Sequence, residues 1–507
     1  MAKILTTPGV YMEGKSAFPN SIVPISTAVP AFIGYTEQAL MNKVDIKHVP
    51  TRISSFGEYV SYFGGGPRPV YKFKKWNNAK TYELTEPTGR YLLYYSMKLF
   101  FANGGSDCYI VSIGNYGMPV NKEDMDGEEF DGNQKIVLKG IRSLTKEAEP
   151  TMVVIPDAVL LTAADCATIQ RSMLEHCGFT MLNRIAILDV YDGFKKRSAD
   201  PKSDVISLFR ESVVDYLQWG TAYYPWVHTT ITSLNAVDFK SIEEISRAGM
   251  IATMIADVNV ASAQGALDKT RAELIKAEIN KISSAREDEV GTVHQTLLVV
   301  SPLYKAIMAS LLELINLLPP GAGLAGIYAM VDKSKGVFQS PANISIGSVV
   351  RPAVNLTNEE QEDLNLPLSG KAINAIRTFP DKGILIWGAR TLDGNSQDWR
   401  YINVRRTVIF IEQSIKYGME PYVFEPNTYA TWMNAKALII NFLTNLWQQG
   451  GLAGTTPEDA FSVSIGLGET MTPVDILDGY MSISVKLAIT RPAEFIVISF
   501  IQKMQQS

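Results

Sequence analysis

Between residues 151 and 227, short apolar segments alternate with helical ones, and this pattern constrains the fold more than any other feature of the sequence. Three segments read as buried strands, namely TMVVIPDA (151–158), RIAILDV (184–190) and AYYPWV (222–227). Helical patterns cover 163–177 and 204–218 between them. Strands separated by helices of about 10 to 15 residues are typical of a mostly parallel sheet with helices packed on it. We therefore predict a mixed α/β fold.

The N-terminal side of this region adds further expected elements. AVPAFIGY (28–35) predicts a buried strand, YLLYYSMKLFFANGG (91–105) a helix that ends at a glycine pair, and CYIVSI (108–113) another strand. The tract 64–90 predicts a loop or a small hairpin. Residues 1–20 are too interrupted by proline and glycine for a helix, so we expect an extended arm there.

A strongly helical region covers residues 262–318. Its apolar side chains recur at intervals of 3, 4 and 7 and comprise Leu267, Leu274, Ile275, Ile279 and Ile282. One apolar stripe on an otherwise charged helix predicts packing through a single face. We expect a surface insertion over about residues 235–318 that packs through this stripe.

The last third of the chain changes character. RYINVRRTVIFIEQSIKYG (400–418) and TYATWMNAKALIINFLTNLWQQGG (428–451) predict two helices, each closed by glycine. GILIWGARTL (383–392), in which we expect Trp387 to be buried, predicts the core strand under these helices. In MSISVKLAI (481–489) apolar and polar residues alternate, which predicts a half-buried strand with one wet face.

The segment EFIVISFIQKM (494–504) is apolar on both faces of a strand. Phe495, Val497 and Ile501 point one way, whereas Ile496, Ile498 and Phe500 point the other. Such a strand at an open edge invites aggregation, so it must be covered or paired. Two interpretations remain open: a central strand of the chain's own sheet, or a strand donated to the sheet of a neighbouring subunit.

Length and composition favour a multi-domain globular protein. The chain has 507 residues, of which 46% are hydrophobic and 20% charged, so we expect two or three domains. The formal net charge is −5 without a long basic run, and we expect no nucleic-acid binding. The N-terminus lacks a signal-peptide pattern, and the apolar segment 306–331 is broken by Glu313, Asn316 and a proline pair, so we expect no direct membrane insertion.

The sequence lacks the usual motifs of cofactor and metal sites. GAGLAG (321–326) satisfies the dinucleotide-binding spacing, but it follows a helix and two prolines rather than a strand. The acidic tract 123–132 lacks the alternating pattern of a calcium loop. The three cysteines form no CxxC pair, and the four histidines, which we expect at the surface or half-buried, form no metal-ligand cluster. We expect no cofactor, no metal and no catalytic residue.

An enzyme built on residues 151–230 is the weaker alternative. Asp157, Asp189 and Asp192 lie near predicted strand ends, where the sites of open α/β sheets gather. Aspartates at strand ends also cap turns, which is the simpler interpretation.

Six ordered blocks stand out in the C-terminal third: GIYAMVDKSKGVFQSPAN (326–343), LNLPLSGKAINAIRTFPDKGILIWGARTL (364–392), WRYINVRRTVIFIEQSI (399–415), YVFEPNTYATW (422–432), GGLAGTTPEDAFSV (450–463) and RPAEFIVISFIQ (491–502). Together these blocks closely resemble the phage tail sheath family. PGVYMEG (8–14) and AVPAFIGYTE (28–37) are also similar to sheath sequences. Residues 235–318 match this pattern poorly.

The resemblance implies a structural subunit that polymerises as stacked hexameric rings around an inner tube and contracts to drive the tube through a target envelope. Its implied partners are neighbouring sheath subunits, the inner tube protein, and baseplate and terminal cap proteins. It implies assembly in the bacterial cytoplasm and then a place in a phage tail or a released extracellular injection particle. The alternative structural class is another strand-exchanging phage protein, of a baseplate or a capsid. The long insertion favours an extracellular injection system over a phage tail or a type VI machine.

The same resemblance implies where the working residues lie. Four parts are expected: an N-terminal linking arm (1–20), outer α/β domains (21–329), an inner domain facing the tube (330–490) and a C-terminal linking arm (491–507). The arm strands that link subunits comprise Ile4, Leu5, Val10, Tyr11, Phe495, Ile496, Val497, Ile498, Phe500 and Ile501. The strand that accepts an arm comprises Ile483, Val485 and Leu487. The candidate tube-facing residues are Glu412, Lys416 and Lys436.

Overall fold

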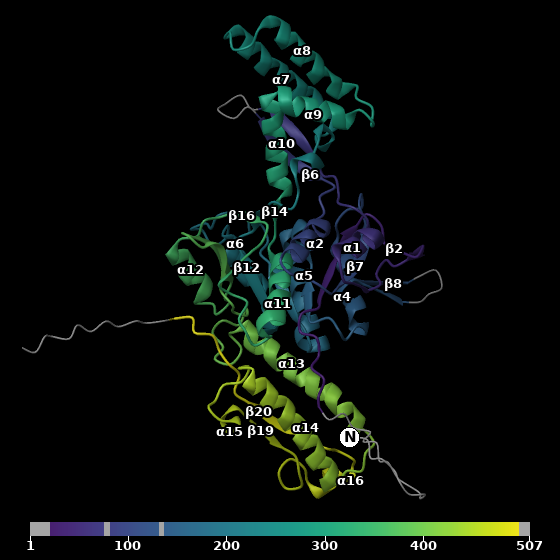
Figure 1. Cartoon of the computed structure of the whole chain (residues 1–507), viewed down its shortest axis with the longest axis vertical. Coiled ribbons are helices and arrows are strands. Elements are labelled where there is room, and N and C mark those ends of the chain that lie inside the picture. Colours follow the sequence, from purple (N-terminus) through teal and green to yellow (C-terminus); the bar gives the residue numbers. More distant parts are fainter. Residues whose placement is uncertain (1–20, 76–81, 131–135, 496–507) are drawn as a thin grey trace, which may run out of the picture. The chain divides into compact units, whose positions relative to one another are not determined.

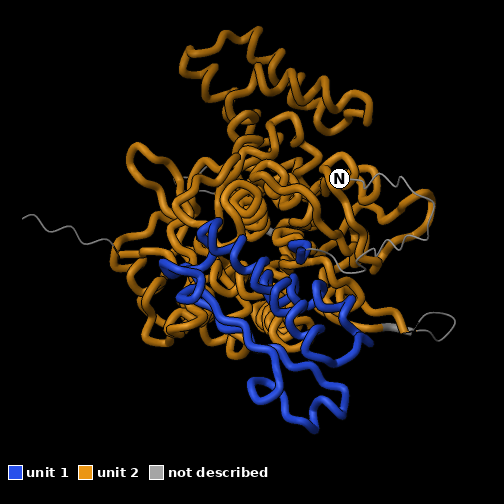
Figure 2. Tube along the Cα trace, turned by 60° about the horizontal axis from the view of Figure 1, so that its bottom comes forward, with its two compact units in different colours: residues 1–25, 410–490 blue, residues 26–409, 491–507 orange. Residues whose placement is uncertain are grey.

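A computed structural model describes residues 21–75, 82–130 and 136–495 (Figure 1). The chain divides into two compact units (Figure 2). Unit 1 comprises residues 1–25 and 410–490, and unit 2 comprises residues 26–409 and 491–507. The chain therefore passes between the units three times, and both units contain segments from distant parts of the sequence.

Unit 2 is built on a sheet that has nine strands in the described part of the chain. Their order is β15 (Ile344–Ser345), β18 (Gly383–Trp387), β17 (Asn374–Phe379), β12 (Gly220–Tyr224), β11 (Ile185–Asp189), β10 (Met152–Val154), β1 (Pro30–Thr36), β7 (Cys108–Asn115) and β4 (Thr51–Ile53). The strands from β17 to β7 run parallel, and antiparallel strands close both edges. The expected mixed α/β fold is confirmed.

Four helices of unit 2 lie against or beside this sheet: α2 (Leu93–Ala102), α5 (Ala163–Glu175), α6 (Val205–Ser212) and α11 (Gly321–Lys335). The side chains of Thr162 and Asp204 cap α5 and α6 by accepting the N–H groups of Asp165 and Ser207. Helix α6 ends at Ser212, earlier than predicted, because the backbone becomes extended at Val213. Helices α1 (Phe56–Phe63) and α12 (Asn358–Asn365) are as long as α6, whereas α3 (Lys122–Met125) and α4 (Gly140–Ser143) are shorter.

Short antiparallel pairs decorate unit 2. The predicted hairpin within 64–90 is present as β5 (Val70–Lys75) and β6 (Tyr82–Thr88). The acidic tract enters a second hairpin, β8 (Asp126–Phe130) with β9 (Ile136–Lys139). A third group joins β13 (Val227–Thr229), β14 (Leu317–Leu318) and β16 (Val349–Pro352).

Residues 235–318 contain the helices α7 (Glu244–Ala263), α8 (Lys269–Asn280), α9 (Val290–Val300) and α10 (Pro302–Ile315), and that this region is an insertion stays a prediction. Ile275, Ile279 and Ile282 are buried, but Leu274 is 64% exposed. Its inclusion in the buried stripe was wrong, because neighbouring positions on a helix lie about 100° apart and Ile275 already occupies the inner face. No single described helix is long and apolar enough to cross a membrane, although α9 and α10, bent by 114°, pass that test as a pair.

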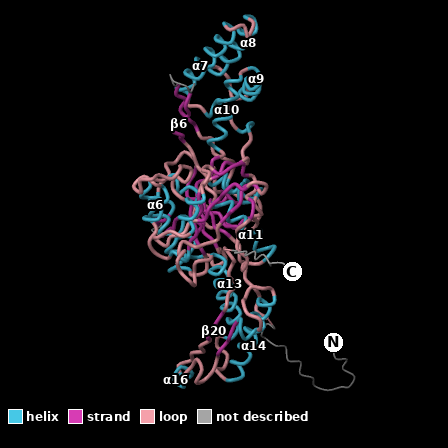
Figure 3. Tube along the Cα trace, turned by 90° about the vertical axis from the view of Figure 1, so that its left-hand side faces the viewer, coloured by secondary structure: helices cyan, strands magenta, loops and turns pink. Residues whose placement is uncertain are grey.

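Unit 1 combines helices with a small sheet. Its helices include α14 (Tyr429–Gln448) and the second half of α13 (Ile402–Met419), which pack through the rings of Phe410 and Phe442 at 5.9 Å. Strands β19 (Phe461–Ser464) and β20 (Ser484–Leu487) form an antiparallel pair, and β19 lies against α14 (Figure 3). The short helices α15 (Pro457–Ala460) and α16 (Pro473–Leu477) complete it.

The division of the structure differs from the sequence-based one at residue 330. Strands β17 and β18 pair with the large sheet, so residues 330–409 belong to unit 2, and the compact C-terminal unit begins at residue 410. The predicted inner and outer domains concern an assembled particle and stay predictions. Trp387 was expected to be buried and is 38% exposed, because it ends β18 and packs on the neighbouring strand's Phe379 at 4.5 Å.

Candidate functional site

The predicted acceptor strand is present as β20, in unit 1. Ile483, Val485 and Leu487 are half-buried, whereas Ser484 and Lys486 are exposed. This alternation follows from the strand's two-residue period, with one face toward the unit's interior and one toward solvent. The half-buried strand predicted from the sequence is therefore confirmed in its burial, while its role as an acceptor stays a prediction.

Strand β20 is paired along one edge only in the described part of the chain. Its single partner among the described residues is β19, with Val485 opposite Val463 and Leu487 opposite Phe461. Beyond β20, the Ala488 N–H donates to Ala460 O at 2.8 Å and the Ala488 carbonyl accepts from Ala453 N at 2.7 Å.

The direction of the other main-chain groups follows from this register. Because Ala488 bonds toward β19, the alternate residues Val485 and Leu487 direct their N–H and C=O groups to the opposite edge. In the described part of the chain no strand pairs with that edge, and a row of free main-chain groups of this kind binds an added strand.

The candidate tube-facing residues lie on the two helices of unit 1. Glu412 and Lys416 are exposed on α13, one turn apart, and Lys436 is half-buried on α14. Charged side chains at such positions form individually weak contacts that are readily released. Their contact with a tube stays a prediction.

Most of the predicted arm residues lie outside the described residues. This applies to Ile4, Leu5, Val10, Tyr11, Ile496, Val497, Ile498, Phe500 and Ile501. Phe495 is described, and its side chain is 69% exposed.

Two of the three aspartates of the enzyme alternative, Asp157 and Asp189, accept hydrogen bonds from the protein's own backbone. Asp157 is fully buried, and its carboxylate accepts the N–H of Tyr35 at 2.9 Å and that of Leu92 at 2.5 Å. It lies between β1 and β10, where the strand order reverses and open α/β sheets bind ligands. Burial raises the pKa of Asp157 to about 6 against the effect of these donors. The carboxylate occupies the position that a ligand would take.

Asp189 fills a second potential anion site. It ends β11, and its carboxylate accepts the Gly321 N–H at 2.8 Å at the start of α11. Burial raises the pKa of Asp189 to about 7. Asp192 instead pairs with Lys195 at 2.6 Å on the surface side.

The GAGLAG motif therefore packs a helix rather than binding phosphate. The two-residue strand β14 precedes it, which the sequence did not indicate, and α11 follows. The helix N-terminus, where a phosphate would bind, already holds the Asp189 carboxylate. A Cβ at Gly323 would meet Leu99 at 3.1 Å, and one at Gly326 would overlap the Phe100 carbonyl oxygen. These glycines allow α11 to approach α2.

The histidines and cysteines form no site in the described part of the chain, where no group of three or more potential metal ligands occurs. His176 and His294 are buried, contrary to expectation. Burial and the nearby Arg184 lower the pKa of His176 to about 3, so the ring is neutral. His294 lies 2.8 Å from the Tyr304 hydroxyl. All three cysteines are free and buried.

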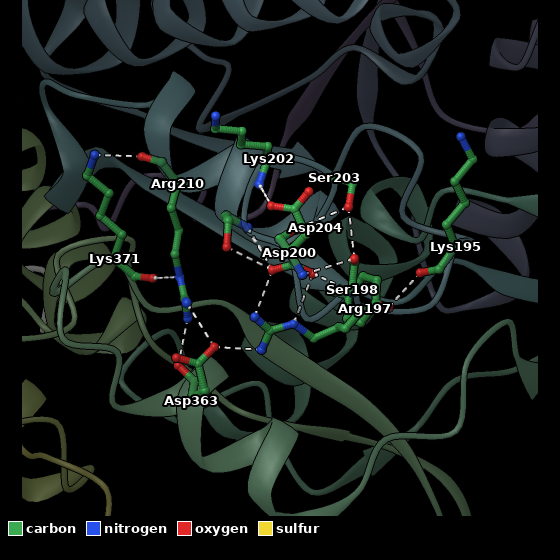
Figure 4. A network of polar contacts seen from close by, with 12 residues as sticks. Lys195, Arg197, Ser198, Asp200, Lys202, Ser203, Asp204, Arg210, Asp363 and Lys371 are labelled. Atoms are coloured by element: carbon green, nitrogen blue, oxygen red, sulfur yellow. Dashed lines mark hydrogen bonds and ion pairs between the residues drawn. The ribbon is translucent and has the colours of Figure 1, made fainter.

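A network of charged side chains in unit 2 joins α6 to α12 (Figure 4). One carboxylate oxygen of Asp363 accepts from Arg197 at 2.6 Å and from Arg210 at 2.9 Å. Arg197 also pairs with Asp204 at 2.8 Å. Burial of Asp204 opposes its ionisation, but the hydrogen bonds from Arg197, Ser207 and Ser198 outweigh burial and lower the pKa of Asp204 to about 2. Because the charges neutralise one another, the network ties the 195–204 segment to α12 and leaves no reactive group.

Sequence reasoning missed the buried arginines of unit 2, which are Arg184, Arg210, Arg390, Arg405 and Arg406. Arg405 lies between the rings of Trp219 and Trp399, at 3.9 and 4.4 Å. Arg390 is 1% exposed and pairs with Glu494. The partners are far apart in the sequence, so the only available signal was the presence of arginine inside apolar segments.

Comparisons with known proteins point to one class. Residues 395–502 match the family model of the phage tail sheath C-terminal domain. A tail sheath protein of Vibrio phage KVP40 (isolate Vibrio parahaemolyticus/Japan/Matsuzaki/1991) is 26% identical over 189 residues, which are 36% of this chain. The match spans 26%, about a quarter, of the length of that relative. The resemblance seen in the sequence is thereby confirmed.

Solved structures extend the likeness to the whole chain. One is the sheath complex of an extracellular contractile injection system, PVC, in the contracted state, with 25% identity, a TM-score of 0.59 and coverage of 99% of each chain. Another is the helical sheath of the anti-feeding prophage in the contracted state, with 25% identity, a TM-score of 0.59 and coverage of 99% of this chain and 100% of that chain.

Proposed function

We propose that this chain, which resembles contractile sheath proteins from end to end, is the structural subunit of a contractile sheath. The observation that carries the proposal is the likeness to two sheath chains over 99% of this chain. The match of residues 395–502 to the sheath C-terminal domain supports it independently. The subunit would polymerise around an inner tube and shorten to drive that tube through a target envelope.

The open edge of β20 supplies a physical route to polymerisation. An added strand gains main-chain hydrogen bonds without requiring a rigid complementary surface, so linked subunits retain freedom to rotate. We propose that strands formed by residues 1–20 and 496–507 of neighbouring subunits pair with this sheet. Links of this kind persist while the surfaces between subunit bodies change.

The partners follow from this role. We propose that the subunit contacts further copies of itself, the inner tube protein, and baseplate and terminal cap proteins, and acts mechanically rather than as an enzyme. The filled sites at Asp157 and Asp189 support a structural role for the α/β sheet. One of the two similar solved sheaths belongs to an extracellular contractile injection system and the other to the anti-feeding prophage. We therefore propose that the subunit assembles in a bacterial cytoplasm and is released as part of such a particle.

Electron microscopy of the chain co-produced with its tube protein tests the proposal. Hollow sleeves with helical repeat are expected, and soluble monomers at all concentrations would contradict it. Truncations that remove residues 1–12 or 496–507 should leave folded subunits that build no contractile sleeves. The second truncation begins after Phe495 so that Arg390 keeps its partner Glu494. Normal sleeves from both truncations would remove the strand-exchange part of the proposal.

A further inference from the structure

The chain leaves unit 1 immediately after the acceptor strand. Residues 488–490 still pair with residues 451–453 and 460 in unit 1, and Thr490 N donates to Gly451 O at 3.4 Å. Residues 491–495 belong to unit 2. We call residues 491–495 the root of the C-terminal segment. The acceptor strand β20 and this root thus belong to different units, although only a few residues separate them.

The root is attached to unit 2 through a charge pair in which Arg390 is buried and the Glu494 side chain is 17% exposed. Arg390 Nε donates to one carboxylate oxygen of Glu494 at 3.0 Å, and Nη2 donates to the other at 2.5 Å. The Tyr401 hydroxyl donates to the same carboxylate at 3.3 Å. Two parallel hydrogen bonds between charged groups fix direction as well as distance.

Arg390 is itself held firmly. Its N–H donates to the Asn374 side chain at 2.8 Å, and its carbonyl accepts from Thr221 and Asn374 at 2.9 Å each. Nη1 donates to Gly394 O at 3.0 Å. The guanidinium is therefore a fixed point of the large sheet, and Glu494 satisfies its remaining charge.

A charge pair at this position selects one register of the attached segment. Buried ion pairs contribute little net stability compared with apolar packing, and specificity of position is their better supported use. The sequence Arg491-Pro492-Ala493-Glu494-Phe495 contains one carboxylate, so a slip by one residue would bury the arginine unpaired. Phe495, the next residue, is 69% exposed.

We propose that Glu494 is a positioning residue for subunit linkage: by pairing with Arg390 it fixes on unit 2 the point from which the C-terminal strand reaches a neighbouring copy. This inference rests on the proposed sheath function. The attachment prevents the segment from swinging with the edge strand of its own unit 1. It also transmits force from the donated strand to the large sheet instead of to β20.

The first test measures the attachment in unassembled subunits. A nitroxide on Phe495→Cys reports the mobility of the root, since the three native cysteines are buried. Glu494→Gln keeps the shape but removes the charge, and it should raise the released fraction about ten- to a hundredfold, the factor for a lost charge-assisted hydrogen bond. The matched control is Asp332→Asn, which breaks another buried pair of unit 2, with Arg406, whose side chains are both 4% exposed. The control should leave the label immobile.

The second test counts and measures sleeves by electron microscopy. Glu494→Gln should give fewer sleeves, or sleeves without uniform pitch, whereas Asp332→Asn should lower thermal stability but give uniform sleeves. Equal label mobility in Glu494→Gln and the unaltered chain would overturn the inference, as would sleeves of unaltered yield and pitch. If the unaltered chain forms no sleeves with its tube, the sheath proposal fails, and the label still decides whether Glu494 holds the root.

Discussion

At the residue scale, the chemistry of unit 2 is dominated by carboxylates that replace ligands. Asp157 and Asp189 lie at strand ends where an enzyme would bind substrate, yet each accepts backbone N–H groups of its own chain. Both carboxyl groups are buried, and burial raises their pKa values to about 6 and about 7. These hydrogen bonds tie the ends of β10 and β11 to neighbouring segments of the chain. The cost is that two carboxyl groups are held where ionisation is unfavourable.

This arrangement predicts how stability changes with pH. The folded-state pKa of Asp189, about 7, lies above the unfolded value of about 3.9, so the folded state retains a proton over that range. The contribution is fully present below about pH 4 and is lost as the pH rises through about 7. Asp189→Asn should remove this pH-dependent loss of stability, which amounts to about 4 kcal/mol because the two pKa values differ by about 3 and one pKa unit corresponds to about 1.4 kcal/mol.

Thermal unfolding of both proteins between pH 4 and 8 measures the difference. The unaltered chain should lose melting temperature toward pH 8 more steeply than Asp189→Asn. Parallel curves for the two proteins would show that the proton is not retained.

At the element scale, close packing explains features that resemble catalytic motifs. Helix α11 approaches α2 at its glycines, and the N–H group that opens α11 is bound by Asp189. The sequence pattern was the one used for phosphate binding, because both uses require glycine where a backbone comes close. The group bound at the helix N-terminus, a phosphate or a carboxylate of the same chain, distinguishes the phosphate-binding use of the glycines from the packing use.

Substitution of these glycines provides a direct check. Gly326→Ala should destabilise the subunit by about 1 to 3 kcal/mol or more, because the new methyl group would overlap the Phe100 carbonyl oxygen. The matched control is Gly291→Ala in α9, where no atom lies within 4 Å of the added carbon. It should be neutral or stabilising by up to about 1 kcal/mol. Denaturant unfolding of both variants measures the contrast, and equal effects would contradict the packing explanation.

The edge strand β20 gives a second element-scale prediction. Val485→Pro removes an N–H group that points to the open edge, and proline is tolerated on that side of an edge strand. The β19 ladder should remain, with a change in stability of about 1 kcal/mol or less. Sleeve formation should nevertheless fail, because the added strand loses a donor and meets the pyrrolidine ring. Val485→Thr keeps the N–H group and the branched side chain, so it should assemble normally; sleeves from both variants would exclude this edge as the acceptor.

At the scale of the whole molecule, the sequence predicted the positions of individual helices and strands but not how distant segments pair. Strands β1, β10 and β11 and helices α2, α5 and α14 appear where hydrophobic periodicity placed them, because each pattern is set by its own residues. The order of strands was not predicted, since the pairing of β12 with β17 joins segments about 150 residues apart. The Arg390–Glu494 pair spans 104 residues and leaves no local pattern.

Assembly of the sleeve depends on contacts between the subunit and its partners, such as the tube. Lys416 is exposed on α13, and a contact with the tube there would be polar and screened by salt. Lys416→Gln should leave subunit stability unchanged within about 0.5 kcal/mol. It should reduce the yield of sleeves on tubes at low salt, and the difference should fade as salt approaches about 1 M, where the Debye length is about 3 Å. Lys333→Gln, at an exposed position near the end of α11 in unit 2, serves as the control and should leave the yield unchanged at every salt concentration. A reduction that is equal for both lysines, or that does not depend on salt, would place the tube contact elsewhere on the subunit.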